Sequence, residues 1–313
     1  MASRNATRRP SENCFYHQRL INTIFREYID KFIVVYIDDI TIYSKTFDEH
    51  LQHLRSIFTK LCEAGLKVQP DKCQFGKTSL PFLGYIIGKN EIKPDPSKVE
   101  KVQDYPVPNN LTTLHEFIGL ALYYRRFIKD FAKIASPLHK LLHKNQPYIW
   151  NEKCQLAFET LKNHLITSPI LTYPDFDKPF ILFTDASSIG LGAILSQKDS
   201  ENHEKVIAYA SRRVNETEAK YSATELECLA VVWAIKLFRP YLHSNIPFDL
   251  ITDHSALKYL FNKPNPPGRL ARWIMTLRDY NFNTIHKKGK THSNVNPLSR
   301  LPYTSDNLIT QPP

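Results

Sequence analysis

The chain has 313 residues, with 41 lysines and arginines against 31 aspartates and glutamates, which gives a formal net charge of +10. This length exceeds the usual size of a single domain, so we expect two or three domains with apolar cores. The positive charge favours a polyanionic partner, most often a nucleic acid. The sequence contains no apolar run of membrane-spanning length and no secretory signal pattern, which predicts a soluble, unsecreted protein without a membrane partner.

Five cysteines are scattered along the chain without any C-x-x-C pair. This spacing argues against a disulfide framework or a zinc knuckle and predicts reduced, buried thiols. A zinc set made of His50, His53, Cys62 and Cys73 is the alternative, although its spacing is not a familiar one. Proline-rich connectors are predicted at three places: 93–96, 105–108 and 262–268.

Two short apolar runs, 32–35 and 40–43, flank the tetrad Tyr36-Ile37-Asp38-Asp39. This pattern predicts two strands joined by a tight turn that carries adjacent carboxylates. Two aspartates in such a turn could hold a divalent metal through oxygen ligands, as polymerases do around phosphates. A solvated Asp-Asp turn is the alternative, because acidic residues are favoured in turns.

A helix is predicted directly after this hairpin. Residues 46–49, Thr-Phe-Asp-Glu, form a capping-box pattern, and Gly65 marks the end of the helix. Apolar residues at helical spacing are expected to share one face: Leu51, Leu54, Phe58 and Leu61. Beyond the helix, Lys72 lies in a K-C-x-F setting, and 82–84 lie on an expected strand.

The pattern from Val99 to Phe131 is helical again, with a second capping box at 113–116. Four residues recur at core spacing: Phe117, Leu120, Tyr124 and Phe127. The other side of this region is basic: Arg125, Arg126, Lys129 and Lys133. Such a face fits a surface that follows a nucleic-acid backbone, and it equally fits a plain solvated helix.

The C-terminal part predicts three strands, a helix, a strand and then helices. The first strand, 180–185, ends in Asp185, and the next two begin near Gly190 and at Val206. A long apolar helix at 221–234 is interrupted by two acids, Glu225 and Glu227. The strand at 248–253 ends in Asp253.

A strand-end Asp, a helix Glu and a second strand-end Asp are what two-metal phosphodiester hydrolysis requires. Hard oxygen ligands on rigid elements can converge to hold two magnesium ions across one phosphate. Glu225 and Glu227 are two residues apart, roughly 200° around a helix, so both cannot face one site. Each of these carboxylates taken alone could also be an ordinary residue without a catalytic role, because Thr-Asp at a strand end and Glu in a helix are both common.

The run from Gln18 to Lys45 resembles the palm of reverse transcriptases from gypsy-type LTR retrotransposons, and the resemblance continues almost without a gap to Arg300. It implies an α/β (α+β) multidomain fold with a mixed sheet, flanked by helices, in a ribonuclease H-like domain. We expect these segments: an irregular N-terminal segment at 1–17, a palm remnant at 18–92, a thumb at 93–143, a connection at 144–178, a ribonuclease H domain at 179–302 and a tail at 303–313.

The resemblance implies that Asp38 and Asp39 are two of three catalytic, metal-binding aspartates of the polymerase. The third lies in the family on an earlier strand, with the fingers, upstream of everything present here. We therefore expect an N-terminally truncated chain that does not synthesise DNA alone. Nucleic-acid contacts are implied for Tyr36, Lys72, Phe82, Leu83, Gly84, Arg125, Arg126 and Lys129. A surface lysine and a core strand are the alternatives for Lys72 and for 82–84.

In the ribonuclease H part, the resemblance implies that Asp185, Glu227 and Asp253 are catalytic and bind Mg²⁺ or Mn²⁺, with Glu227 at the family's E-x-x-A position. The family's fourth aspartate falls on Asn296, whose amide can ligate a metal but brings no charge. We therefore expect slow cleavage of the RNA strand of RNA–DNA hybrids. Two histidines in one loop, His286 and His292, could help product leave, or could simply be solvated.

The expected partners are RNA–DNA hybrid, primer–template and possible further Pol or Gag products, and the expected location is the cytoplasm, in virus-like particles, or the nucleus. Two rival interpretations stay open. One is a decayed nucleic-acid-binding remnant, which Asn296 permits. The other is a polymerase that is active only within a longer product.

Overall fold

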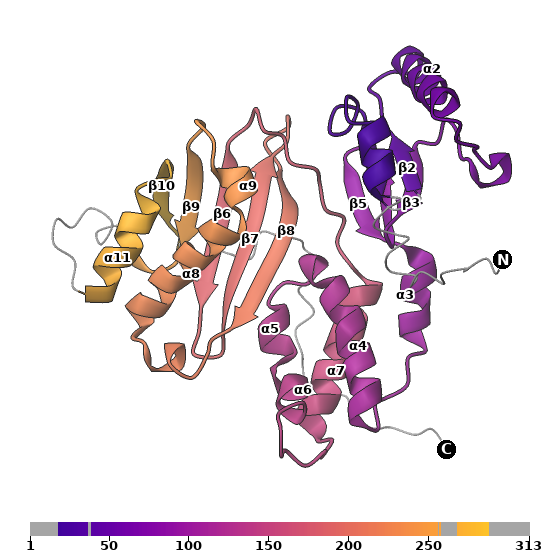
Figure 1. Cartoon of the computed structure of the whole chain (residues 1–313). Coiled ribbons are helices and arrows are strands. Elements are labelled where there is room, and N and C mark those ends of the chain that lie inside the picture. Colours follow the sequence, from indigo (N-terminus) through magenta and orange to yellow (C-terminus); the bar gives the residue numbers. More distant parts are fainter. Residues whose placement is uncertain (1–17, 37–38, 256, 258–267, 288–313) are drawn as a thin grey trace, which may run out of the picture. The chain divides into compact units, whose positions relative to one another are not determined.

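The computed structural model describes residues 18–36, 39–255, 257 and 268–287 (Figure 1). The chain divides into two compact units, Met1–Thr78 and Ser79–Pro313. The division falls inside the expected palm segment, 18–92, whose bounds stay a prediction. A mixed α/β architecture, as expected, is present.

The first unit is a small hairpin packed with helices. Residues 18–24 are helical, followed by β1 (Ile33–Tyr36), β2 (Asp39–Ile42), α2 (Phe47–Glu63) and the 3-10 turn η1 (Pro70–Lys72). β1 and β2 pair in antiparallel register, from Ile33 opposite Ile42 to Tyr36 opposite Asp39. The expected hairpin is therefore confirmed. Its buried core consists of Ile21, Phe25, Ile33, Ile57 and Leu61.

The predicted start of α2 is correct, but the predicted buried face is wrong. The Thr46 side chain accepts the Glu49 N–H at 3.2 Å, as an N-cap should. Leu61 is buried, yet Phe58 is 40% exposed, and the buried partner of Leu61 is Ile57. The inner stripe is thus rotated by about one residue, because tertiary contacts choose among several apolar positions on the helix.

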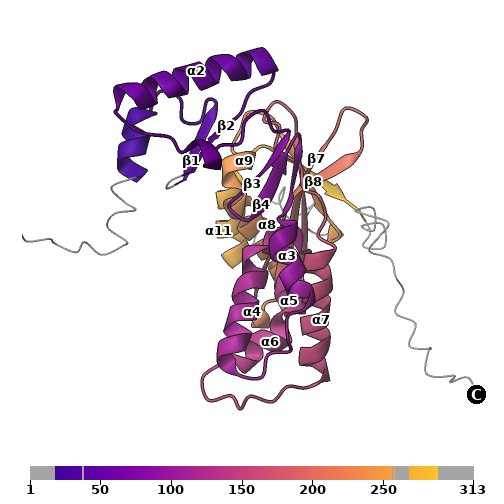
Figure 2. The ribbon, with the colours of Figure 1, turned by 90° about the vertical axis from the view of Figure 1, so that its right-hand side faces the viewer.

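The second unit begins with a three-stranded antiparallel sheet and continues into a bundle of helices that gather side by side (Figure 2). The strands are β3 (Ser79–Phe82), β4 (Tyr85–Gly88) and β5 (Glu91–Pro94). The helical elements are α3 (Pro96–Gln103), α4 (Leu111–Tyr123), the 3-10 turn η2 (Arg125–Phe127), α5 (Phe131–Ile134), α6 (Ser136–Leu141) and α7 (Glu152–Ile166).

The helix expected from Val99 to Phe131 is broken into shorter pieces, and its predicted cap is misplaced. α4 begins at Leu111, with Asn110 as its N-cap and Thr113 as the third helical residue of the capping box. Asn110 accepts the Thr113 N–H at 2.9 Å, so asparagine supplies the cap that we expected from threonine. The core spacing was correct, since Phe127 is 1% exposed.

One core runs through α3 to α7. Val102, Phe117, Phe158 and Leu161 belong to the same buried cluster. The Phe117 and Phe158 rings lie 4.6 Å apart and join α4 to α7. The segments expected as thumb and connection therefore share one core, and the bounds given for them stay a prediction.

A five-stranded mixed sheet forms the rest of the second unit, in the order β10-β9-β6-β7-β8. Its strands are β6 (Phe180–Ala186), β7 (Gly190–Lys198), β8 (Glu204–Arg213), β9 (Phe248–Thr252) and β10 (Phe282–His286). β9 is parallel to β6 and to β10, whereas the other pairs are antiparallel. The accompanying helical elements are η3 (Glu218–Lys220), α8 (Ala223–Leu237), α9 (Arg239–Leu242) and α11 (Gly268–Leu277).

Both faces of this sheet are covered. Leu182 and Leu195 pack with α8 in one core, whereas Ile194 and Tyr209 pack with the helical bundle in the other. Neighbouring residues such as Ile194 and Leu195 thus enter different cores, as the two-residue period of a strand requires. β10 was not expected from the sequence, which predicted only helices after β9.

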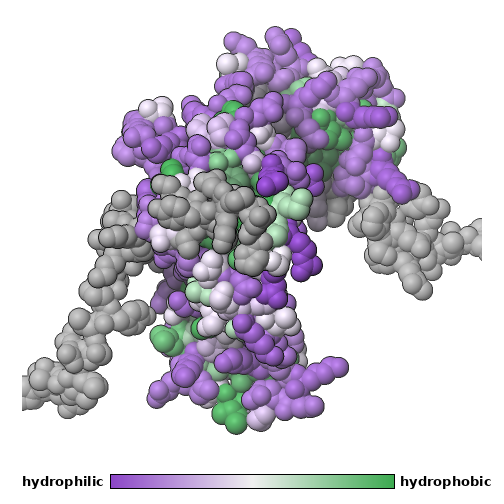
Figure 3. All heavy atoms as spheres, turned by 90° about the vertical axis from the view of Figure 1, so that its left-hand side faces the viewer, coloured by the Kyte–Doolittle hydropathy of each residue, from purple (hydrophilic) through white to green (hydrophobic). Residues whose placement is uncertain are grey.

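No helix in the described part of the chain is long and apolar enough to cross a bilayer. On the face drawn in Figure 3, hydrophilic side chains predominate and hydrophobic ones form scattered patches.

The shared core of the helical bundle predicts that two leucine-to-alanine variants of α7 differ in their free energy of unfolding. Leu161 is fully buried, whereas Leu156 on the same helix is 54% exposed. Leu161→Ala should lower the free energy of unfolding by about 2–5 kcal/mol, because it leaves a cavity. Leu156→Ala should change it by under about 1 kcal/mol. Urea unfolding followed by tryptophan fluorescence measures both, and equal effects would contradict the shared core.

Candidate metal centre

Two aspartates lie at the same edge of the mixed sheet. Asp185 is the penultimate residue of β6, and Asp253 directly follows β9. The two strands are hydrogen-bonded neighbours, with Phe183 opposite Ile251. Because parallel strands end at the same edge of a sheet, this pairing brings the two carboxylates together.

The third carboxylate, Glu227, comes from α8, which packs on β6. Its side chain is buried, at 7% exposure, and the backbone N–H of Ala186 faces it. Its oxygen Oε2 is buried without a hydrogen-bond partner among the described residues. A buried polar atom left unpaired is costly, so this oxygen is suited to a partner that the described chain does not supply.

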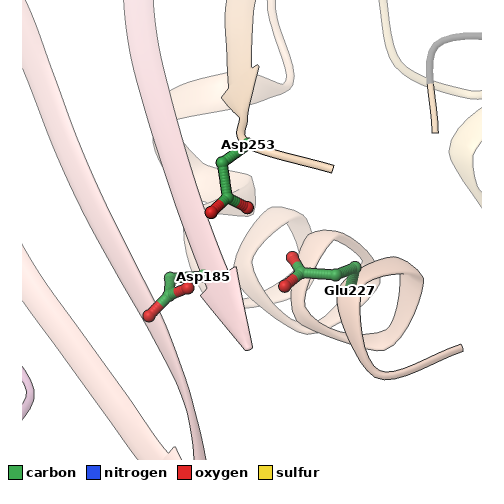
Figure 4. A group of neighbouring side chains, drawn as sticks. All are labelled: Asp185, Glu227 and Asp253. Carbon is green, nitrogen blue, oxygen red and sulfur yellow. The ribbon is translucent and has the colours of Figure 1, made fainter. Parts of the chain in front are cut away.

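The three side chains converge from two strands and a helix, as Figure 4 shows. One carboxylate oxygen from each of Asp185, Glu227 and Asp253 lies within 4.8 Å of the others. Such a set of hard oxygen donors suits a divalent cation of the Mg²⁺, Mn²⁺ or Ca²⁺ type. The residues therefore fit a metal, and their arrangement forms a possible acidic metal site.

The neighbouring Glu225 has a different role. It accepts the Ser222 N–H at 2.9 Å in the capping box of α8, and its other oxygen pairs with Arg269 at 2.8 Å. The Arg269 guanidinium also lies 3.9 Å from the centre of the Tyr221 ring. Glu225 thus fastens α8 to α11, and the structure groups only Glu227 with the two aspartates.

Like charges crowd the site. Burial, followed by the charges of Asp185 and Asp253, raises the pKa of Glu227 to about 8. Desolvation also raises the pKa of Asp185, and next in size comes repulsion from Asp130, ahead of Asp253. Lys133 and Lys129 act on Asp185 in the opposite direction.

Asp130 is the residue at this site that the sequence did not reveal. It lies between η2 and α5, and the sequence pattern singles out only the lysines on either side of it. Nothing in the local pattern indicates its proximity to Asp185, which is 55 positions later. A glycine in β7, Gly192, was the indirect signal, because it leaves space opposite Asp185.

The Tyr36–Asp39 tetrad is only partly described. Tyr36 ends β1 and Asp39 begins β2, and both side chains are exposed. Ile37 and Asp38 lie outside the described residues, so the paired carboxylates expected here stay a prediction. Lys72 is exposed in η1. This exposure fits both a nucleic-acid contact and an ordinary surface lysine.

The segment 82–84 forms a clasped turn rather than a continuous strand. Phe82 ends β3, while Leu83 and Gly84 have φ of 49° and 73°. The hydroxyls of Tyr123 and Tyr124 donate to the carbonyls of Leu83 and Gly84, the latter at 3.0 Å. The end of α4 therefore fixes both carbonyls of the turn.

Only some of the basic residues expected to contact nucleic acid are exposed. Arg125 and Lys129 are exposed, whereas Arg126 is half-buried, with its Nε unpaired in the described chain and its guanidinium 6.0 Å from the Phe127 ring centre. Asn296, the expected fourth ligand, lies outside the described residues, as does His292. His286 ends β10, and its Nε2 lies 2.9 Å from the Asp253 carbonyl, so it is not the loop histidine that we expected.

The expected alternative of a zinc set is not supported. Ser44 Oγ lies 3.2 Å from His50 Nδ1 and 2.8 Å from His53 Nδ1. Across the described residues, the three carboxylates are the only His, Cys, Asp or Glu group that gathers at ligand distances.

Glu227→Gln should stabilise the metal-free protein at high pH. The wild-type carboxyl has an ordinary pKa of 4.5 and a folded pKa of about 8, so its contribution to stability is complete below 4.5 and is lost as pH rises through 8. The amide does not titrate. In EDTA, the variant's gain over wild type should grow by roughly 2–4 kcal/mol between acidic and strongly alkaline conditions. Exposed Glu216→Gln is the control, and a pH-independent gain in unfolding free energy would contradict the expectation.

Two family models match the chain: "Reverse transcriptase (RNA-dependent DNA polymerase)" over residues 15–87 and "RNase H-like domain found in reverse transcriptase" over residues 175–280. The Pol polyproteins of the Drosophila melanogaster transposons 297 and gypsy are similar, at 43% identity over 286 residues and 36% over 295. These matches cover 91% and 90% of this chain, but the chain spans only 26% and 28% of those relatives.

Solved structures of the foamy viral protease-reverse transcriptase share the fold. The complex with RNA/DNA hybrid has a TM-score of 0.72 at 23% identity, and it covers 95% of this chain and 40% of that one. A complex with double-stranded DNA has a TM-score of 0.75 at 22% identity, with coverage of 88% and 49%. The sequence matches show that the chain belongs to the reverse transcriptase and ribonuclease H family of retrotransposon Pol polyproteins.

Proposed function

We propose that the C-terminal part of the chain hydrolyses the RNA strand of RNA–DNA hybrids at the Asp185, Glu227 and Asp253 site. The observation that carries this proposal is the convergence of the three carboxylates within 4.8 Å, from three separate elements. The buried, unpaired oxygen of Glu227 supports it, because a metal ligand has a reason to stay unpaired in the protein alone.

Each residue has a distinct task in this proposal. Glu227 is held from the protein interior, facing the Ala186 N–H, and anchors the site. Asp185 and Asp253 are exposed, so a phosphodiester can approach the side that they line. Divalent ions, when bound, would activate water and stabilise the leaving oxygen. Lys129 and Lys133 place positive charge near Asp185, where a phosphate backbone would pass.

The choice of substrate rests on the relatives. The foamy viral enzyme is seen with RNA/DNA hybrid and with double-stranded DNA, which supports both as ligands of this chain. Mg²⁺ or Mn²⁺ is the proposed ion, because the donors are all oxygens. The expected sites of action, virus-like particles or the nucleus, stay predictions.

For the polymerase half, we propose that a polypeptide of these 313 residues does not extend a primer. The resemblance implies three metal-binding aspartates, and the Tyr36–Asp39 tetrad supplies two of them. Missing charge stabilisation and nucleotide positioning would each raise the barrier by several kcal/mol.

The purified chain should cleave the RNA strand of a labelled hybrid, slowly, and faster with Mn²⁺ than with Mg²⁺. Mn²⁺ binds oxygen and nitrogen sites more tightly, which compensates for a neutral Asn296. Asp185→Asn should abolish cleavage, whereas Asn296→Asp should raise the rate. Gel analysis of the labelled RNA measures all of these.

The control is Asp177→Asn, which removes an exposed carboxylate before β6 and should leave the rate unchanged. Wild-type protein inactive in both metals, with no activity gained by Asn296→Asp, would leave the decayed binding remnant as the better account. Cleavage that survives Asp185→Asn would point to a contaminating nuclease.

Hybrid binding should weaken steeply with salt, because phosphate contacts release counterions. Replacing both Arg125 and Lys129 by alanine should make the slope of log affinity against log salt shallower by about 2. Replacing exposed Lys153 and Lys236 removes the same charge and should have little effect on the slope. Fluorescence anisotropy across a salt series gives the slopes, and equal slopes for the two double variants would rule out this basic face as the contact.

A further inference from the structure

The segment before α5 carries a carboxylate to the metal centre. Asp130 has φ 55° and ψ 26°, the left-handed conformation, and its side chain forms no cap for α5. Two residues later, the Ala132 N–H donates to Ser211 Oγ on β8 at 2.8 Å. α5 also packs along β8. The position of Asp130 is therefore fixed by the sheet that carries Asp185.

The surroundings of Gly192 show how close the Asp130 carboxylate comes to strand β7. An added Cβ at Gly192 would lie 3.1 Å from Asp130 Oδ1, so that oxygen occupies the space which a side chain would fill. Gly192 pairs with Asp185 across the antiparallel ladder. Side chains of paired residues lie on the same face, with Cβ atoms about 4.5–5.5 Å apart. The Asp130 carboxylate therefore lies over β7, on the side of Asp185.

In the described part of the chain, no cation is paired with this carboxylate at ion-pair distance. Among the described residues, no hydrogen bond or ion pair reaches the Asp130 side chain, although lysines flank it in sequence. Bringing one carboxylate beside another without a partner is unfavourable unless a cation is present. The buried, unpaired Oε2 of Glu227 independently indicates a cation at the same centre.

Resting on the proposed function, we propose that Asp130 is an outer carboxylate of the metal centre, which strengthens the binding of a divalent cation through the cation's water molecules. It is a positioning residue, since it is outside the group of three that meets at ligand distance. It supplies, from the helical bundle, negative charge that Asn296 does not supply.

The alternative is that an aspartate stands at position 130 only because it tolerates the left-handed backbone conformation there. Aspartate, asparagine and glycine all tolerate the left-handed conformation, so this conformation alone would explain an aspartate here. Asp130→Asn and Asp130→Gly keep the backbone preference and remove the charge. These two variants therefore separate the charge from the conformation.

The test is Mn²⁺ binding to the full chain, measured by the electron paramagnetic resonance of free Mn²⁺, without nucleic acid. Both Asp130 variants should bind Mn²⁺ about tenfold more weakly than wild type, the size expected for an outer partner of a metal site. The control Asp177→Asn, which removes an exposed carboxylate elsewhere in the chain, should bind as wild type does. Urea unfolding in EDTA should show that all variants are folded, because the new residues tolerate the same backbone conformation as aspartate.

Wild-type affinity in both Asp130 variants would overturn this inference alone and leave the three-carboxylate site intact. Loss of affinity in Asp130→Gly but not in Asp130→Asn would also overturn it, because the charge would then not matter. No detectable binding in wild type, equal to Asp185→Asn, would overturn both this inference and the proposed function.

Discussion

The parallel pairing of β6 with β9 is the interaction on which the candidate site depends. Strands far apart in sequence end at one edge of the sheet, where Asp185 is the penultimate residue of β6 and Asp253 directly follows β9. The pairing is possible because α8 provides the crossover between β8 and β9 and covers the sheet on the way. The same helix delivers Glu227 to the edge, so a single topological choice assembles all three carboxylates.

This arrangement has an energetic cost that the rest of the unit must offset. Three carboxylates, one of them buried, lie close together in the protein alone, and the raised pKa of Glu227 reflects first its burial and then the repulsion from the two aspartates. Two apolar cores, one on each face of the sheet, supply the compensating stability. Sites with strained electrostatics of this kind generally exchange stability for function.

Much of this was accessible from the sequence, and the failures share a cause. Strand ends and the capping box at Thr46 follow from short-range pattern. The helical period shows that Glu225 and Glu227 cannot both face the site, and the family resemblance selects Glu227. The shifted face of α2, the cap at Asn110 and the late strand β10 depend on which neighbours a segment meets, because tertiary contacts override local preference. Asp130 is the extreme case, since only the packing of α5 on β8 relates it to Asp185.

The tyrosine clasp on the β3–β4 turn has a mechanical consequence. Two consecutive carbonyls are tied to adjacent residues at the end of α4, and the Tyr85 hydroxyl returns a bond to the Tyr123 carbonyl. Three bonds in so small an area leave no hinge between the turn and the helix. A tilt of α4 would therefore move the β3–β4 turn with it.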